Sequence, residues 1–194
     1  MSHIVYQLKI SLGGSDPLIW RSLEVLGSTP LSDLHDMFQI AMGWQNEHFY
    51  QFVIDDRCYG DTELGFGDNR IDASMVTLGE LVKRPKTLFL YEYDLNDGWE
   101  HEVLVEKIYP VKDLSDLHLP QCLAGENACP PEDSGGIFGY YELLALLKDP
   151  EHPAYDELKN QYGVLKPEHF DLKLANHRLQ AVFHDEDPAH EVFS

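Results

Sequence analysis

Hydrophobic and polar side chains alternate at the start of the chain, which predicts a β-strand with one buried face. Every second residue from Ile4 to Leu12 is apolar, and this period is typical of a half-buried strand. The next five residues, Gly13 to Pro17, are turn formers. A second strand is predicted over residues 18–26, so the two strands should form a hairpin.

The spacing of apolar residues becomes helical after this hairpin. Thr29 is predicted as the N-cap of a helix and Pro30 as its first residue. Gly43 stands where a C-terminal cap is expected. The apolar stripe between them recurs at three- and four-residue steps and consists of Leu31, Leu34, Phe38 and Ala41.

Three more strands are predicted in the middle of the chain. Residues 49–54 form the first, and residues 87–94 lead through the turn Asn96-Asp97-Gly98 into a return strand that begins at Trp99. Residues 60–74 are polar and rich in Gly and Asp, which predicts a loop. Thr77 and Glu80 have the spacing of a capping box, which predicts a short helical turn.

The last third of the chain is expected to be loop and helix. Residues 111–136 are predicted as a loop, and residues 184–194 as a frayed tail. Helices are predicted over residues 138–148, 154–162 and 172–183. We therefore expect one domain over residues 1–194, with a core over about 4–110 and a loop-and-helix extension over about 111–183.

These elements predict an α+β fold. The order of the core elements, ββαββ, is that of a β-grasp-like mixed sheet of about five strands, in which the last strand runs parallel to the first. The three C-terminal helices would form an extension that packs on the sheet edge or on its open face.

The charge of the chain restricts its partners. It holds 34 acidic and 14 basic residues, a formal net charge of −20. Binding to nucleic acid or to an anionic membrane needs clustered Lys and Arg, so neither is expected. A basic protein partner or a metal cation suits this charge, although acidity also serves solubility alone.

The compartment is predicted from cysteine usage and from the apolar runs. Three cysteines, an odd and sparse set, favour a reducing compartment. The first residues lack the features of a signal peptide, and no apolar run reaches the length of a membrane span. The predicted location is the cytoplasm.

Several motifs together resemble a known family, the plasmid Ri open-reading-frame-three-like family, whose members are also described as TnpR-like passengers of insertion elements. The resemblance covers about residues 4–183 and implies an α+β fold and a link to mobile elements, but no particular activity. The matching segments are Ile19-Trp20-Arg21, Leu34-His35, Gln39 to Trp44 with His48, Tyr91 to Asp94 with Asp97, Trp99 and His101, Cys122 to Glu126, Ala128 to Asp133, Gly135-Gly136 and Gly139-Tyr140.

The chain departs from the family pattern at three places. Tyr50 stands where many members carry a second His, and Ser134 stands where Cys is frequent. Leu95-Asn96 replaces the usual Phe-Gly of the central hairpin. The first two departures weaken the case that the family's His and Cys residues form a fixed metal cage here.

Acidic residues near a histidine are the first candidates for chemistry. Asp94, Asp97 and His101 lie around the predicted hairpin turn, and Glu132 and Asp133 follow Pro130-Pro131. Paired carboxylates beside an imidazole can hold a divalent metal or act in acid–base catalysis. Asp in such a turn also bonds its own backbone, and His101 shares a face with Trp99 and Val103, so turn and core roles are the alternative.

Two further sets of residues are weaker candidates. Cys122 and Cys129 could bind a metal with His48 or His101 if the loop folds back onto the sheet, but six intervening residues do not match the usual zinc spacing. The alternatives are a redox pair or ordinary buried thiols. Trp44, His48 and Trp99 are candidate ligand-binding residues, and aromatic residues of this kind also form cores. No cofactor is expected, apart from the divalent metal considered above.

Two classes of function fit these residues, one non-enzymatic and one enzymatic. The first is a protein-interaction or ligand-binding module that uses a free sheet edge or its acidic charge. The second is a metal-assisted or acid–base hydrolase, in which the hairpin residues Asp94, Asp97 and His101 would meet the Cys129-Pro-Pro-Glu-Asp133 loop.

Overall fold

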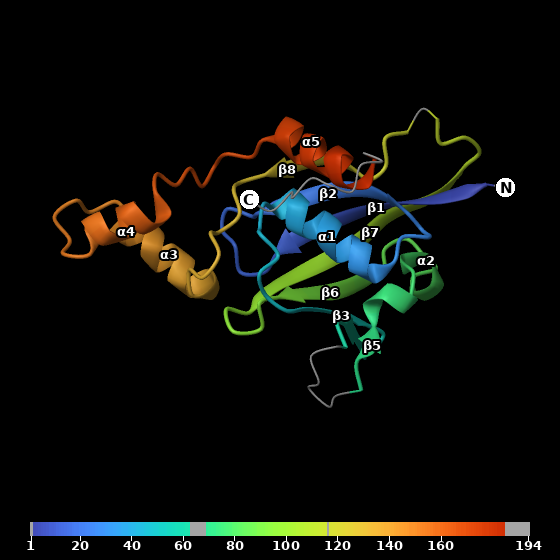
Figure 1. The fold of residues 1–194 in the computed structure, drawn as a ribbon, viewed down its shortest axis with the longest axis horizontal. Helices are drawn as coiled ribbons and strands as arrows, with labels where there is room; N and C mark the ends of the chain where they lie inside the picture. The colour runs from blue at the N-terminus through green and yellow to red at the C-terminus, as the bar shows by residue number, and fades with distance from the viewer. Residues whose placement is uncertain (1, 63–68, 116, 185–194) are drawn as a thin grey trace.

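One eight-stranded β-sheet is the framework of the protein (Figure 1). The computed structural model describes residues 2–62, 69–115 and 117–184. The strand order is β5-β4-β3-β6-β7-β1-β2-β8, and within the described residues only β4 and β5 run parallel. The strands are β1 (His3–Leu12), β2 (Trp20–Leu26), β3 (Tyr50–Ile54), β4 (Arg57–Gly60), β5 (Ile71–Asp72), β6 (Leu88–Tyr93), β7 (Trp99–Val111) and β8 (Gln121–Glu126).

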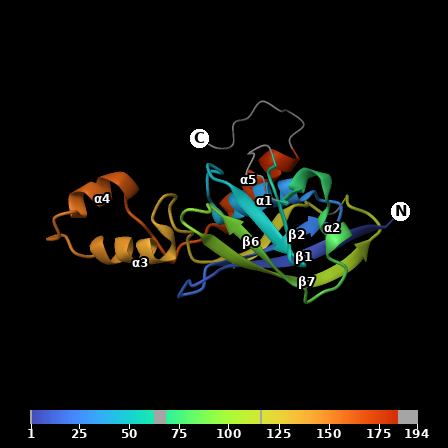
Figure 2. The same ribbon diagram turned by 90° about the horizontal axis from the view of Figure 1, so that it is seen from below.

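The helices are placed unevenly around this sheet. Two helices, α1 and α5, lie over one face of the sheet, while α3 and α4 project away from it (Figures 1 and 2). No helix among the described residues is long and apolar enough to cross a membrane. The helical elements are α1 (Leu31–Met42), the 3-10 turn η1 (Ala73–Met75), α2 (Leu78–Leu81), α3 (Gly136–Leu146), α4 (Tyr155–Tyr162) and α5 (Leu172–Phe183).

The predicted caps of the first two helices are largely confirmed. Gly43 ends α1 in the left-handed conformation, with φ 98, and its N–H donates to the carbonyl of Gln39. The N-cap of α1 is Pro30, one residue later than predicted, and the helix begins at Leu31. The capping box of Thr77 and Glu80 is formed as predicted, so these local patterns locate both ends of α1 and the start of α2 to within one residue.

The prediction of a five-stranded β-grasp-like sheet is wrong, although the α+β class agrees with the structure. The sheet has eight strands, and β1 pairs antiparallel with β7. The turn after β6 sends the chain back as β7, a strand of 13 residues that matches the 10-residue β1 along its length. Strand β7 lies between β6 and β1 and pairs antiparallel with both. Strand β6 therefore runs parallel to β1 but does not pair with it.

Three strands were not predicted from the sequence, because they are short or because their apolar and polar residues do not alternate. Strands β4 and β5 have four and two residues, and β5 lies in the predicted loop 60–74. Strand β8, Gln-Cys-Leu-Ala-Gly-Glu, lies in the predicted loop 111–136. The three predicted C-terminal helices are present as α3, α4 and α5, and the predicted tail after His184 lies outside the described residues.

The hydrophobic core lies between the sheet and α1. Leu31, Leu34 and Phe38 of α1 are fully buried in this core, where the ring of Phe38 packs against Phe52 of β3 and Tyr91 of β6. The opposite face of the sheet carries no helix (Figure 2). Glu92 on β6 and Glu100 on β7 are directly paired across the strands of that face, beside Glu102. One face of the sheet is therefore apolar, and the other carries these glutamates together with the exposed Leu88 and Leu90.

One edge of the sheet is closed by a helix. The side chain of Asn176 on α5 accepts from the N–H of Cys122 in β8 at 2.8 Å and donates to the carbonyl of Cys122 at 2.8 Å. The amide of Asn176 thus replaces a neighbouring strand at this point. Because α5 covers the β8 edge, that edge is not open for the addition of a partner strand.

Candidate functional site

Three segments that are distant in the sequence meet at one end of the sheet. His48 lies between α1 and β3, Asp94 directly follows β6, and Glu132 and Asp133 belong to the loop between β8 and α3. The Nε2 atom of His48 lies 3.0 Å from Asp133 Oδ1, 3.6 Å from Asp94 Oδ2 and 3.9 Å from Glu132 Oε2. Three predicted catalytic candidates and one predicted ligand-binding residue are therefore neighbours. We call these four residues the His48 cluster.

Asp94 is fixed by its own turn. Its side chain is 3 % exposed, and its Oδ1 atom accepts from the N–H groups of Asn96 at 3.0 Å and Asp97 at 3.3 Å. Asp94 has a positive φ of 49, a conformation that Asp tolerates better than most residues. With Oδ1 used in this way, Oδ2 is left to face His48.

Glu132 is held from two sides, whereas Asp133 reaches the surface. Glu132 Oε1 accepts from the N–H of Gln45 at 2.8 Å and from the hydroxyl of Tyr93 at 3.0 Å. Burial raises the pKa of the Glu132 carboxyl above its ordinary value. The Asp133 side chain is 67 % exposed, so the cluster is open to solvent on one side.

The loop that brings in Glu132 and Asp133 is fastened to the central hairpin. Asp97 Oδ2 accepts from the N–H of Gly135 at 2.9 Å, and Trp44 Nε1 donates to the carbonyl of Pro130 at 2.9 Å. Gly136 has φ 69, and a Cβ there would lie 2.3 Å from the carbonyl oxygen of Asp97. The close approach of hairpin and loop therefore requires glycine, and Asp97 positions the site without belonging to it.

The donor set suits a divalent metal ion. One ligand atom each from His48, Asp94 and Asp133 lies within 4.8 Å of the others. The Nε2 atom of His48 is buried and makes no hydrogen bond in the described structure. An imidazole with two carboxylates, open to solvent on one side, is an arrangement that holds Mn²⁺, Fe²⁺ or Zn²⁺ and leaves positions for water.

His101 and Trp99 lie in the core, apart from this cluster. Both side chains are almost fully buried, and each ring packs against Trp44. His101 Nδ1 contacts the carbonyl of Tyr91 at 3.2 Å, and burial lowers the pKa of His101 to about 4. The structure thus gives these two predicted candidates a core environment.

Cys122 and Cys129 do not belong to the His48 cluster, although Cys129 lies near Glu132. Among the described residues, neither joins a group of three potential metal ligands. Burial raises the pKa of the Cys122 thiol to about 11 and that of the Cys129 thiol to about 12, so both are uncharged near neutral pH.

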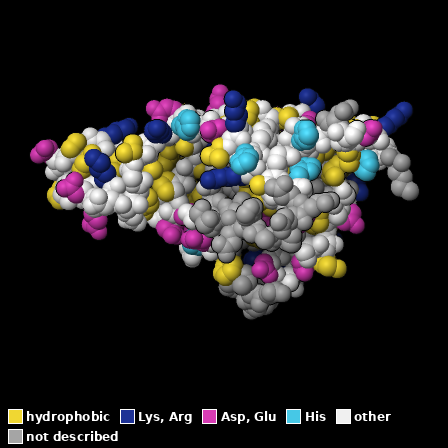
Figure 3. Space-filling model, turned by 45° about the horizontal axis from the view of Figure 1, so that its top comes forward, with side chains coloured by type: hydrophobic (Ala, Val, Ile, Leu, Met, Phe, Trp, Pro, Cys, Tyr) yellow, Lys and Arg dark blue, Asp and Glu magenta, His cyan; other side chains and the backbone are white. Residues whose placement is uncertain are grey.

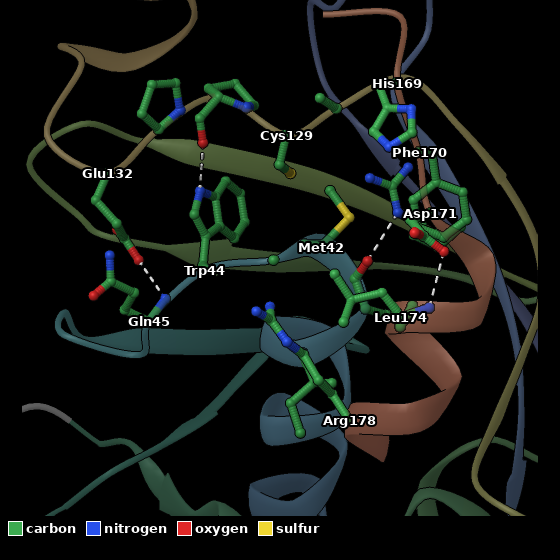
Figure 4. Close-up of a pocket in the computed structure, with 18 of the residues that line it drawn as sticks. Met42, Trp44, Gln45, Cys129, Glu132, His169, Phe170, Asp171, Leu174 and Arg178 are labelled. Carbon is green, nitrogen blue, oxygen red and sulfur yellow. Dashed lines mark hydrogen bonds between the residues drawn. The ribbon is translucent and has the colours of Figure 1, made fainter. Parts of the chain in front are cut away.

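A cavity of about 400 Å³ lies beside the cluster, between the end of α1, the Pro130-Pro131 segment and α5 (Figure 4). Trp44 and Glu132 line one end of it, and Phe170 and Arg178 line the other. Arg21 of β2 also lines this cavity and is only 1 % exposed.

Sequence reasoning missed Arg21 as a functional candidate, although a pattern could have revealed it. Ile19, Leu23 and Val25 are the buried positions around β2, and Arg21 occupies the same inward-facing register. A charged residue at an inward position of an alternating strand is unusual unless something pairs with it.

The comparisons with known proteins agree with the resemblance of the motifs. The chain is 38% identical over 154 residues to "Uncharacterized protein y4hQ" of Sinorhizobium fredii (strain NBRC 101917 / NGR234), covering 79% of this chain and 78% of the relative. A crystal structure of a protein of unknown function, MM3350 from Methanosarcina mazei Go1, superimposes with a TM-score of 0.77 at 35% identity, covering 89% of this chain and 98% of that one.

The segments that match the motifs of the family contribute residues to the His48 cluster. His48, Asp94 and the Pro130 to Asp133 segment come from three separate motifs and meet at the cluster. Residues 4–174 match the sequence profile of the plasmid pRiA4b ORF-3-like protein family, and the chain belongs to that family.

Proposed function

We propose that the chain binds a divalent metal ion through His48, Asp94 and Asp133, and that hydrolysis is the reaction this site serves. The observation that supports the proposal is the convergence of these side chains around the buried Nε2 atom of His48, which lacks a hydrogen bond in the described structure. A bound ion would lower the pKa of a coordinated water and so supply a nucleophile.

Electrostatics favours a cation at this position. Three carboxyl groups, on Asp94, Glu132 and Asp133, surround one imidazole. Carboxylates at such short range repel one another, and a cation between them removes that repulsion. Asp94 is buried, so its charge is poorly screened by solvent.

Glu132 is placed to exchange a proton with a coordinated water. Burial raises the pKa of Glu132, which brings it nearer to the operating range of a general base or acid. The hydroxyl of Tyr93 and the N–H of Gln45 keep the carboxyl oriented. The roles are therefore divided: His48, Asp94 and Asp133 bind the ion, and Glu132 moves the proton.

Metal titration tests the binding step. After chelator treatment, we expect Mn²⁺ or Zn²⁺ to bind with measurable heat in calorimetry and to raise the melting temperature. Asp94→Asn and Asp133→Asn should each weaken binding by about tenfold or more, because each removes a charged ligand. Circular dichroism checks that each variant keeps its fold.

Matched controls are available in the turn between β3 and β4. Asp55 and Asp56 are exposed and have positive φ values of 49 and 59, close to the 49 of Asp94 and the 54 of Asp133. Asp55→Asn and Asp56→Asn therefore repeat the chemical change on the same kind of backbone and should leave metal affinity unchanged. Equal affinity in all four variants, or no metal binding to the wild type, would show that the cluster is only an ion pair of His48 with its carboxylates.

Turnover tests the reaction class. Chromogenic esters and phosphate esters should be hydrolysed in the presence of Mn²⁺ or Zn²⁺, and Glu132→Gln should lower kcat while metal affinity remains. A metal-assisted hydrolase would be contradicted by turnover that a chelator does not reduce. It would also be contradicted if Asp133→Asn turned over as fast as the wild type.

A further inference from the structure

Arg21 is a buried charge without a counter-charge. Its side chain makes three hydrogen bonds, all to neutral backbone carbonyls: Nε to Ala41 at 2.9 Å, Nη1 to Trp20 at 2.7 Å and Nη1 to Glu126 at 2.9 Å. No carboxylate among the described residues forms an ion pair with Arg21, and Nη2 makes no hydrogen bond there. A guanidinium buried in this way is costly unless an anion meets it.

The other neighbours of Arg21 do not supply a negative charge. The ring of Phe170 covers the guanidinium at 3.9 Å, a cation–π contact that offsets part of the cost of burial. The thiols of Cys122 and Cys129 are nearby, and burial raises their pKa values to about 11 and about 12. Both thiols are therefore neutral at physiological pH, and the charge of Arg21 stays uncompensated.

The space beside Arg21 fits a small molecule. The cavity of about 400 Å³ that Arg21 lines falls within the range of ordinary ligand sites, roughly 300–1,000 Å³. Met42, Trp44 and Leu174 provide apolar walls. Polar donors and apolar walls in one concave site are typical of pockets that orient an organic ligand.

The surroundings of the cavity are more basic than the chain as a whole. Helix α5 carries Lys173, His177 and Arg178 and no acidic residue, although the net charge of the chain is −20. Figure 3 shows Lys, Arg and His side chains along the upper part of the molecule, together with several Asp and Glu side chains. Arg178 lines the cavity and makes no hydrogen bond or ion pair within the described residues.

The two carboxylates at the cavity wall are already engaged. Glu132 accepts from Gln45 and Tyr93, and Asp171 caps α5 by accepting from the N–H of Leu174 at 2.9 Å (Figure 4). Neither carboxylate is bonded to an arginine, so Arg21 and Arg178 each keep N–H groups that can donate hydrogen bonds to a ligand.

We propose that this cavity binds a small organic anion, a molecule with a carboxylate or phosphate group, whose oxygens pair with Arg21 and Arg178. The Nη2 group of Arg21 donates to the anion at the base of the cavity, and Arg178 meets it at the rim. Trp44 and Phe170 contact the organic part of the ligand. The inference goes beyond the metal site and holds for the metal-free protein, because Arg21 and Arg178 need no cation to bind an anion.

Thermal shift and calorimetry with chosen anions test the proposal on the full chain in the presence of a chelator. The probes are inorganic phosphate, phenyl phosphate, acetate and benzoate, with potassium chloride at equal ionic strength as the reference. We expect saturable stabilisation by at least one anion, and tighter binding of the phenyl compounds because the cavity walls are apolar. The phosphate and carboxylate arms separate the two ligand chemistries.

Variants distinguish a built site from general attraction to positive charge. Arg178→Gln should weaken binding by about tenfold, while Lys173→Gln, the same charge change on the same helix outside the cavity lining, should not. Arg21→Lys keeps a positive charge but removes the guanidinium, including Nη2 and the three bonds of Nε and Nη1 to backbone carbonyls, and it should weaken binding as well. If Arg21→Lys unfolds the chain, the comparison of Arg178→Gln with Lys173→Gln still decides.

Two results would overturn the proposal. One is that none of the four probes stabilises the wild type more than chloride at tens of millimolar concentration. The other is that Arg178→Gln and Lys173→Gln bind with equal affinity. Asp133→Asn should retain the anion affinity of the wild type, so a failed metal site and a failed anion site give different results.

Discussion

At the scale of single residues, two buried histidines are expected to contribute to the response of the protein to acid. His35 bonds to Tyr91 and Asn46 through its two ring nitrogens and stacks on Tyr50 at 3.5 Å. His101 is enclosed by Trp44 and Tyr91. Burial lowers the pKa of His35 to about 3 and that of His101 to about 4. Both rings are therefore neutral in the folded protein and take up protons more readily when it unfolds.

We predict that the protein loses stability in acid and that His101 accounts for part of the loss. The pKa of His101 is about 4 in the folded protein, below the value of about 6.5 in the unfolded chain. Its contribution to the free energy of unfolding is therefore fully present above about pH 6.5 and is lost as the pH drops toward about 4. His101→Leu should flatten the fall in urea midpoint between about pH 6.5 and about pH 4. An unchanged slope in this variant would show that His101 does not drive the acid response.

The candidate site could be predicted in part because its residue types are chemically conspicuous. Asp94, Glu132 and Asp133 stood out as carboxylates near turns, and the structure brings them to His48. The pairing with His48 depends on how the loop after β8 returns to the hairpin, which no local pattern encodes. Arg21 was missed because its role depends on the cavity that α1 and α5 form above β2.

At the scale of elements, local patterns predicted the hairpins and helices better than the pairing of strands. Alternation located β1 and β7, and caps located the ends of α1. The neighbour of β1 was predicted wrongly, because strand order depends on contacts between residues about 100 positions apart. Strand β8 shows the same limit, since it exists through its partners β2 and α5.

The contact of α5 with β8 gives an element-scale prediction. Asn176→Leu removes both bonds to the backbone of Cys122 and leaves a partly buried N–H and C=O without partners. We expect the free energy of unfolding to fall by about 1–3 kcal/mol. Hydrogen exchange at the Cys122 amide should accelerate.

A change on the exposed side of the same helix serves as the control. Lys173 is exposed and makes no hydrogen bond within the described residues, so Lys173→Leu should leave exchange at Cys122 as in the wild type. Equal exchange rates in both variants would show that Asn176 does not protect the strand edge.

At the scale of the whole molecule, acidic side chains are unevenly distributed, although Glu132 and Asp171 line the cavity. The sheet face without helices holds Glu92, Glu100 and Glu102, whereas α5 on the other face holds only basic and neutral residues. This polarity favours a basic protein partner on the open sheet face and a small anion beside α5. The partner remains a prediction.

The net charge of −20 leads to a prediction about nucleic acid. We expect no mobility shift of duplex DNA by the isolated chain at moderate salt, because its 14 Lys and Arg residues are outnumbered by 34 Asp and Glu residues that repel phosphate groups. A shift that weakens with added salt would contradict this prediction and would support direct contact with DNA.

The position of β1 has a consequence for the order in which the protein can fold during synthesis. β1 leaves the ribosome before the other seven strands of this sheet, yet it lies in the interior of the sheet between β2 and β7. It can form its hairpin with β2 early, but its other side stays open until residues 99–111 have been translated. Such late pairing slows folding and leaves a strand edge exposed in the nascent chain, where chaperones act.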